Sequence, residues 1–370
     1  MMIPQTADEL LAAIDDPTEP WAPNWLDRIS DRLALPFLID PRDVVFTRLM
    51  MRILTQVMPF VALLFALPGW WALALALPYV AFIYGRFGGP VMLGLHAVTH
   101  RPLFRKPVRG VATLMTHVFP PFWGLTPFAY RTHHVLMHHS ENNGDDDLSG
   151  TTEYQRDNLK HFGHYWLRFF LFGYWHMASW MLRKDKKGVA KLLLGDAACY
   201  GSMIALGFFK PAATLVVFLM PFLMMRYFMM AGNWTEHAFV DSDQPTNSYR
   251  NSTCLINTPY NHRCYNAGYH LIHHLRPGCH WGDTPAAFEK FLPRLIEQDA
   301  IMFFGVRNNQ LIWWKLMSGD YDFLAERLLD LGNRRPSHEE KVAFLKSRTQ
   351  GQRGEIKGLL ERREHAGLVA

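Results

Sequence analysis

The sequence predicts an all-α integral membrane protein with four transmembrane helices, paired as two hairpins beneath a helical cap on the cytosolic side. Hydrophobic residues make up 49% of its 370 residues, yet the mean hydropathy of −0.06 is close to zero, so long apolar runs must be balanced by polar segments. The stretch from Ile53 to Gly85 contains no charged residue. Lysine and arginine residues flank such runs, as in proteins held at an anionic membrane surface. These three observations favour one membrane core with a soluble cap.

Charge and cysteine content argue against several other classes of protein. The net charge of +5 is not gathered into the basic stripe, interleaved with aromatic residues, that a nucleic-acid-binding protein shows. No C-x-x-C pair is formed by the four cysteines, which disfavours a zinc ribbon, an iron–sulfur cluster and a disulfide scaffold: Cys199, Cys254, Cys264 and Cys279. The N-terminus, MMIPQTADELLAAIDD, lacks the basic-then-apolar form of a signal peptide.

The first hairpin is predicted after a polar lead-in. Residues 1–44 are interrupted by prolines, and we expect a soluble or interfacial segment there. As one helix, Ile53 to Gly85 would run about 50 Å, well beyond a hydrocarbon core of about 30 Å. The Pro68-Gly69 pair near its centre therefore predicts two short spans joined by a tight turn. Three flanking arginines are expected to snorkel to one membrane interface: Arg48, Arg52 and Arg86.

The second hairpin is predicted after a long interfacial helix. His161 to Leu182 is aromatic and amphipathic, and its interrupting polar residues favour a position in the interface rather than across the membrane. A basic run that marks the cytoplasmic side follows: Arg183, Lys184, Lys186, Lys187 and Lys191. Leu192 to Phe209 and Ala212 to Ala231 then fit two further spans, with a turn at Lys210-Pro211.

Counting spans gives the expected topology of a multi-pass protein. Two spans separate the N-terminus from the first histidine cluster, and two more separate that cluster from the last one. All histidine clusters and both termini are therefore expected on the cytoplasmic side. The membrane domain is predicted over residues 45–285. Residues 286–370 are expected to form a soluble helical cap and charged tail, with amphipathic helices over Pro285–Phe304 and Leu311–Leu331.

Histidines recur in four short clusters. His96 and His100 are four residues apart just beyond the second span, and Asn233 and His237 repeat this spacing beyond the last one. The other two clusters read H-x3-H-H and H-x2-H-H: His134, His138 and His139; His270, His273 and His274. Residues four apart share one face of a helix, which is how metal sites are built between the helices of a bundle.

These clusters predict metal binding, because neutral imidazole suits iron, zinc, copper or nickel. A lone histidine pair is usually surface decoration or core filler, but several clusters on one side of a membrane are hard to explain that way. Nine imidazoles exceed what one four-coordinate ion uses, so a centre of two metal ions is the simplest interpretation. The H-E-x-x-H pattern of a zinc protease is absent, and a metal transporter would place its ligands at mid-span.

The three histidine boxes, in this order, resemble the membrane fatty acid desaturase and hydroxylase superfamily over roughly residues 45–285. The resemblance implies an O2-dependent, non-haem di-iron oxidoreductase with four spans and a cytosolic cap that carries the boxes. It also implies that eight histidines ligate two iron ions: His96, His100, His134, His138, His139, His270, His273 and His274. Stearoyl-CoA desaturases carry an Asn-x3-His element after the last span, which implies a further imidazole from His237 and a water-mediated amide from Asn233.

The gaps within the boxes leave the substrate open. Acyl-CoA desaturases typically have four residues in the first gap and two in the second, whereas both gaps here are three. Three-residue gaps occur in acyl-lipid desaturases, hydroxylases and alkane-oxidising relatives. The leading expectation is desaturation of a fatty acyl or lipid chain, and the alternative is hydroxylation of an alkyl chain, carotenoid or sphingolipid. A zinc membrane hydrolase or a metal transporter is the more distant alternative.

Residues close to the boxes are candidates for supporting the metal ligands. Metal-bound histidines donate their second N–H to carboxylates or carbonyls, and six carboxylates lie near the boxes in sequence: Glu141, Asp145, Asp146, Asp147, Glu236 and Asp241. The run Asp145 to Asp147 is equally compatible with a solvated loop. His133 is expected to support the site or face the surface.

Electrons are expected from a separate ferredoxin, rubredoxin or cytochrome b5 system, because neither terminus shows the haem-binding motif of a fused cytochrome b5. Four basic residues beyond the first box could receive an acidic carrier or hold lipid headgroups: Arg101, Arg105, Lys106 and Arg109.

Overall fold

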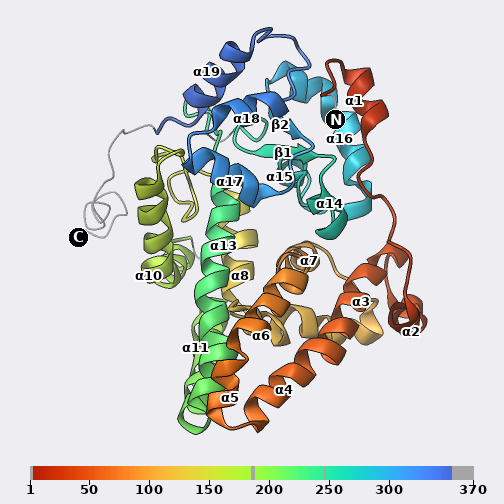
Figure 1. Cartoon of the computed structure of the whole chain (residues 1–370), viewed down its shortest axis with the longest axis vertical. Helices are drawn as coiled ribbons and strands as arrows, with labels where there is room; N and C mark the ends of the chain where they lie inside the picture. Colours follow the sequence, from red (N-terminus) through yellow and green to blue (C-terminus); the bar gives the residue numbers. More distant parts are fainter. Residues whose placement is uncertain (1–2, 185–187, 246, 352–370) are drawn as a thin grey trace.

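The computed structural model describes residues 3–184, 188–245 and 247–351, which are mostly helical. Figure 1 shows two long helical hairpins standing side by side, with a cap of short helices and two strands over one end. The N-terminal helix α1 (Ala7–Ala13) lies against the cap, beside α16 (Thr284–Glu297). The predicted helical class therefore holds for the described residues, which contain one two-stranded sheet.

The first hairpin turns where the sequence predicts. Its first arm is a continuous helix made of η2 (Pro41–Asp43), α3 (Val44–Arg52), the π-helix η3 (Ile53–Val57) and α4 (Met58–Ala66). After a turn at Leu67-Pro68, the second arm consists of α5 (Gly69–Ala74), α6 (Ala76–Phe82), the π-helix η4 (Ile83–Gly88) and α7 (Gly89–His100). The second arm breaks at Leu75 because Pro78 has no N–H to donate to the carbonyl of Ala74.

The second hairpin joins α11 (Val189–Phe209) to a long helix through Lys210. That helix runs through α12 (Pro211–Thr214), the π-helix η9 (Leu215–Leu219) and α13 (Met220–Glu236). Within the described residues, three helices are long and apolar enough to cross a membrane: Pro41–Ala66, Val189–Phe209 and Pro211–Glu236. The second predicted span, interrupted at Leu75, is not one of them.

The long helix α10 (Leu159–Arg183) packs beside α13 (Figure 1) and is not one of the candidate spans. Its aromatic face meets that of α13, where the rings of Tyr165 and Trp234 lie 4.9 Å apart. In the basic run that follows, Arg183 and Lys184 form ion pairs with Asp146 at 3.3 and 3.1 Å. Lys186 and Lys187 lie outside the described residues.

Two of the arginines that we expected to snorkel are paired instead. Arg48 is buried and contacts Asp31 at 2.6 Å, and Arg52 contacts Asp27 at 2.6 Å. Both carboxylates belong to α2 (Trp25–Ala34). The prediction for Arg48 and Arg52 is therefore wrong, because these arginines fasten the N-terminal segment to the first span and do not reach for lipid headgroups.

The cap is not purely helical, and our expected helix boundaries there are wrong in two places. Strands β1 (Thr253–Ile256) and β2 (Ile301–Phe304) pair in parallel, with Thr253 opposite Ile301. The expected helix to Phe304 ends with α16, at Glu297. The expected helix from Leu311 to Leu331 is two helices, α17 (Asn309–Met317) and α18 (Tyr321–Arg327), divided at Gly319, which has a φ of +70°.

The remaining cap helices are short and surround this strand pair. They are α14 (Pro259–Arg263), α15 (His270–Leu275) and, near the C-terminus, α19 (His338–Arg348). Both strands are wholly buried, and Cys254 and Met302 pack with α15 and α16 in one apolar cluster. The strand pair thus supports the helix that carries the last histidine box.

One buried arginine connects the loops next to α10, α13 and α19. Arg156 has no exposed surface, and its guanidinium donates to the carbonyl oxygens of Ala238, Arg348 and Gln350 at 2.8, 2.9 and 2.7 Å. Further donation to Thr151 keeps the loop before α10 in place. The loops that leave α13 and α19 are therefore fixed to the same side chain.

Replacing Arg156 with methionine should lower the free energy of unfolding by about 3 kcal/mol or more, because several buried carbonyls lose a charged donor. The thermal unfolding midpoint of the purified protein in detergent measures this effect. The control is Arg294→Met, whose side chain is 53% exposed, pairs with Glu297 and lies over the Tyr249 ring, so its loss should cost under about 1 kcal/mol. Equal midpoints for the two variants would contradict the role given to Arg156.

Candidate metal centre

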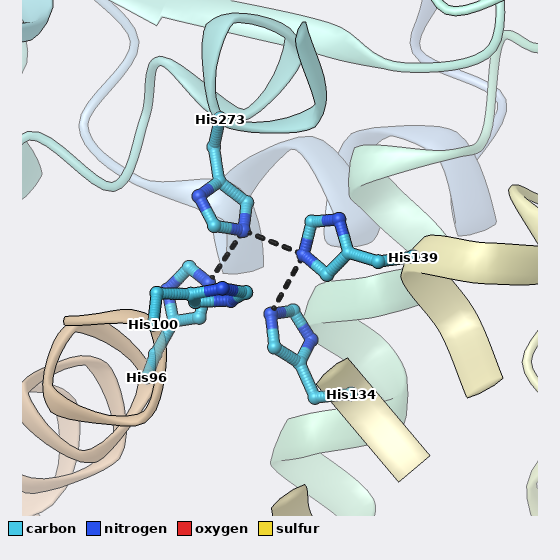
Figure 2. A group of neighbouring side chains, drawn as sticks. All are labelled: His96, His100, His134, His139 and His273. Carbon is cyan, nitrogen blue, oxygen red and sulfur yellow. Dashed lines mark hydrogen bonds between the residues drawn. The ribbon is translucent and has the colours of Figure 1, made fainter. Parts of the chain in front are cut away.

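Five histidines from α7, η8 (Thr132–His138), α9 (His139–Glu141) and α15 converge and form what we call the five-histidine cluster (Figure 2). Its members are His96, His100, His134, His139 and His273, and their ligand nitrogens lie within 4.8 Å of one another. The Nε2 atom of His273 is 2.8 Å from the Nε2 atoms of both His96 and His139. The first box on α7 thus meets the second and third boxes.

Four more histidines form a second group, the four-histidine cluster. These are His138, His237, His270 and His274, again with ligand nitrogens within 4.8 Å of one another. The Nε2 atom of His270 lies 3.2 Å from that of His237 and 3.0 Å from that of His274. The clusters are neighbours, because the rings of His139 and His274 are 5.0 Å apart.

The second box contributes to both clusters because its helix is unusually wide. The segment from Thr132 to His138, η8, is a π-helix, in which residues five apart face the same way. His134 and His139 therefore point together, with Nε2 atoms 3.2 Å apart, while His138 points to the other cluster. An ordinary α-helix would have paired His134 with His138.

The third box is divided in the same manner. His270 and His274, one turn apart on α15, belong to the four-histidine cluster, and His273 belongs to the other. The three histidines of this box therefore do not all face one metal position. The second and third boxes each contribute to both clusters, whereas the first box serves the five-histidine cluster alone.

The donor set fits metal ions. Burial lowers the pKa of His100 to about 4 and that of His237 to about 3, so both rings are neutral at pH 7 and offer a lone pair. The Nε2 atoms of His100 and His138 are buried and have no hydrogen-bond partner within the described part of the chain. Metal–nitrogen bonds of about 2.1 Å place neighbouring ligand atoms about 3.0 to 3.4 Å apart, close to the 2.8 to 3.2 Å between the nearest Nε2 atoms of both clusters.

The outward-facing nitrogens of the four-histidine cluster meet acceptors. His138 Nδ1 lies 2.7 Å from the Asp147 carboxylate, and His237 Nδ1 lies 2.6 Å from the carbonyl oxygen of Asn251. Glu236 lies 3.5 Å from His270 Nδ1. A proton held at Nδ1 by such an acceptor leaves the Nε2 lone pair aimed at the cluster.

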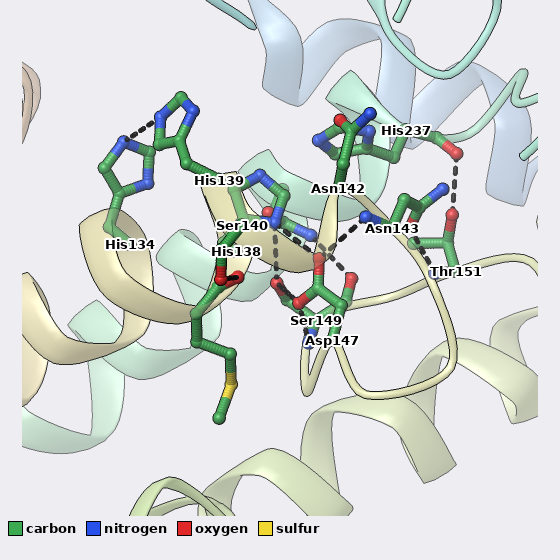
Figure 3. A network of polar contacts seen from close by, with 12 residues as sticks. His134, His138, His139, Ser140, Asn142, Asn143, Asp147, Ser149, Thr151 and His237 are labelled. Atoms are coloured by element: carbon green, nitrogen blue, oxygen red, sulfur yellow. Dashed lines mark hydrogen bonds and ion pairs between the residues drawn. The ribbon is translucent and has the colours of Figure 1, made fainter. Parts of the chain in front are cut away.

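Asp147 is itself fixed by a network of donors (Figure 3). Its carboxylate accepts from the backbone N–H groups of Asn143 and Ser149 at 3.0 and 2.9 Å, and from the Ser149 hydroxyl at 2.8 Å. The other residues of the acidic run, Asp145 and Asp146, are exposed. The run is thus part loop surface and part support for the metal centre.

The other predicted supporting residues have different partners. Asp241 pairs with Arg250 at 2.7 Å, and Glu141 with Lys184 at 3.2 Å. The amide nitrogen of Asn233 donates to the Ser149 carbonyl at 3.0 Å and to the Tyr165 hydroxyl at 2.9 Å. His133 is buried outside both clusters, with its ring 5.1 Å from that of Phe169.

A cavity of about 560 Å³ leads to the two clusters. Imidazoles from both line it: His96 and His134 from one, and His270 from the other. Its walls come from α7, α13 and the first turns of α14 and α17, together with Asn233 and His133. No pattern in the sequence indicated this cavity, because its lining is assembled from segments far apart in the chain.

Comparison with known proteins identifies one protein family. A family model described as Fatty acid desaturase matches residues 68–305, well over half of the chain. The matched region contains every histidine of the two clusters. No curated protein and no solved structure matches the chain.

Removing one imidazole tests whether the two clusters bind metal independently. His237→Ala leaves three imidazoles in the four-histidine cluster, so the purified protein should lose about one equivalent of bound iron while the other ion stays. Elemental analysis after loading with ferrous iron and dialysis gives the count. His262→Ala, an exposed histidine outside both clusters, is the control. Loss of both ions, or of neither, would contradict two separate sites.

Asp147→Asn tests the support of His138. The amide of the variant carries no charge, and it places an N–H donor against groups that also donate. The metal affinity of the four-histidine cluster should therefore fall by about 10- to 100-fold. Competition with a chelator measures that affinity. Asp146→Asn, next to it but exposed, is the matched control and should bind metal like the wild type. Equal affinities for the two variants would disprove the role of Asp147.

Proposed function

The chain belongs to the fatty acid desaturase family, and we propose that it is an O2-dependent, non-haem di-iron oxidase that desaturates a fatty acyl or lipid chain. The observation that supports this proposal best is the pair of adjacent imidazole clusters at one cavity. Family membership makes the chain an oxidoreductase-type protein with histidine groups suited to metal. Desaturation itself, and iron as the metal, belong to the proposal.

The nine imidazoles and Asn233 are the proposed metal site. One iron ion would be held by the five-histidine cluster and the other by the four-histidine cluster, with Asn233 contributing through water. Bound iron supplies the activation of O2 that oxidation of an unactivated C–H bond requires. Asp147, the Asn251 carbonyl and Glu236 keep the imidazoles of the four-histidine cluster in one tautomer and orientation.

The cavity is the proposed place for the alkyl chain. Its walls include Met92, Leu93, Met225 and Met229, which offer an apolar surface and exclude water from the reacting carbon. The same residues could hold a chain that is hydroxylated, since desaturation and hydroxylation diverge only after the first hydrogen is removed. Hydroxylation of an alkyl chain, carotenoid or sphingolipid is therefore the alternative outcome of the test below.

An external electron donor of the ferredoxin, rubredoxin or cytochrome b5 type is part of the proposal. A second, small cleft of about 60 Å³ reaches His100 and His273, and Arg101 and Arg276 line it. Two guanidinium groups beside the more exposed cluster suit an acidic carrier. Of the four basic residues considered from sequence, only Arg101 lines this cleft.

The membrane arrangement completes the proposal. Three apolar helices are compatible with a multi-pass membrane protein. We propose that the interrupted second arm of the first hairpin also crosses, giving four spans with the cap and both termini in the cytoplasm. Arg48 and Arg52 form ion pairs with α2. These pairs are compatible with the proposed topology, because they place α2 at the same membrane interface as the two arginines.

Lipid analysis by mass tests the proposed reaction. The protein, expressed with iron and a reductase system, should yield lipids that have lost two hydrogens, and gain of one oxygen would instead identify a hydroxylase. His138→Ala and His270→Ala should abolish the product while the protein remains in the membrane, and His262→Ala should not. Stoichiometric zinc with no O2-dependent product would overturn the proposal in favour of a hydrolase or transporter.

A further inference from the structure

The large cavity differs in chemistry between its two ends. Its inner end is formed by the imidazoles, and its walls are apolar. The exposed members of its lining mark the opening: Phe228, Pro259, Arg263, Arg307 and Gln310. Two of these five residues carry a guanidinium group, so the opening is strongly basic. A ligand made only of hydrocarbon would need no charge at this opening.

Both arginines sit on backbone that is held in place. Arg263 is the last residue of α14 and donates to the carbonyl oxygens of Gly85 and Arg86 on η4, the latter at 2.8 Å. The carbonyl oxygen of Arg307 accepts from the Thr258 hydroxyl at 2.8 Å, which ties the loop after β2 to the N-cap of α14. The two side chains thus start from fixed points on the rim of one opening.

Neither guanidinium is neutralised by the protein. Throughout the described ranges, no carboxylate lies within 4 Å of Arg263 or Arg307, although most of the buried arginines of this chain are paired or fully hydrogen-bonded. Within the same ranges the Arg307 side chain has no hydrogen-bond partner. The only carboxylate that lines the cavity is Glu236, which is 15% exposed and accepts from Asn309 at 2.8 Å. The opening therefore offers unused donors to a ligand.

We propose that Arg263 and Arg307 form an anion-binding site that holds the acidic head group of the substrate, a carboxylate or a phosphate, while its alkyl chain lies in the cavity. The identity of that chain as the substrate rests on the proposed function. Arginine binds both anions through paired N–H donors, with hydrogen bonds roughly twice as strong as neutral ones. Anchoring the head group at a fixed opening would also decide which carbon reaches the metal clusters, counted from the acidic end.

Binding to the iron-loaded protein without reductant tests the site apart from turnover. The probes are hexadecanoate, 1-hexadecanoyl lysophosphatidate and hexadecanol, which share one alkyl chain and differ in head group. At least one acidic probe should bind about tenfold or more tightly than the alcohol. The acidic probe that shows this preference identifies carboxylate or phosphate as the natural head group.

The preference should depend on the two arginines. The variant Arg307→Gln should lose most of the preference for the acidic probe. The double variant Arg263→Gln with Arg307→Gln should lose all of this preference, while its affinity for hexadecanol stays unchanged. Arg307→Gln is the safer variant, since its side chain has no partner in the described fold, whereas Arg263 also holds η4. Arg28→Gln with Arg32→Gln removes the same charge from exposed positions on α2 and should keep the preference.

Two results would overturn the anion site. One is equal binding of the acidic probes and the alcohol by the wild type, and the other is an unchanged preference in the double variant. Failure of the proposed function is seen separately, as a wild-type protein that prefers an acidic probe but oxidises no lipid when supplied with O2 and electrons. Oxidation of lipid by a wild type that shows no preference would overturn the anion site alone.

Discussion

The structure depends on holding nine imidazole rings together in two clusters, in each of which the ligand nitrogens lie within 4.8 Å of one another. Such an arrangement leaves lone pairs without enough donors, and buried polar atoms without partners are costly. His100 and His138 show this directly, since their Nε2 atoms have no partner in the described structure. Metal ions would satisfy these atoms. The surrounding protein must hold the rings in place, and much of the remaining polar structure serves that purpose.

The supporting contacts come from loops more than from the long apolar helices. Asp147 fixes His138 and is itself fixed by Asn143 and Ser149, and the carbonyl of Asn251 fixes His237. These loops would be free to move if they were not fastened to the cap. Arg156 provides that connection, because it donates to the backbone carbonyls of Thr151, Ala238 and Arg348. Loop order and ligand geometry are therefore parts of one network.

The two clusters differ in the exposure of their histidines and in the cavities that reach them. All five members of the five-histidine cluster are partly exposed, whereas three of the four members of the other cluster are buried. A small cleft that contains Arg101 and Arg276 reaches the five-histidine cluster, and the large cavity reaches both clusters. Electrons and alkyl chain can thus approach the centre by separate routes. The unpaired arginines at the opening of the large cavity give its entrance a chemical preference that the apolar walls lack.

The sequence by itself determined the short histidine clusters, the turns of both hairpins and the largely helical fold, because these follow from local spacing and long apolar runs. Tertiary structure decided how the histidines are divided, since a π-helix in the second box joins His134 to His139 where an α-helical reading joins His134 to His138. It also decided the pairing of β1 with β2, the ion pairs of Arg48 and Arg52, and the basic opening of the cavity. Each of these depends on contacts between segments far apart in the chain, and residue spacing carries no information about such contacts.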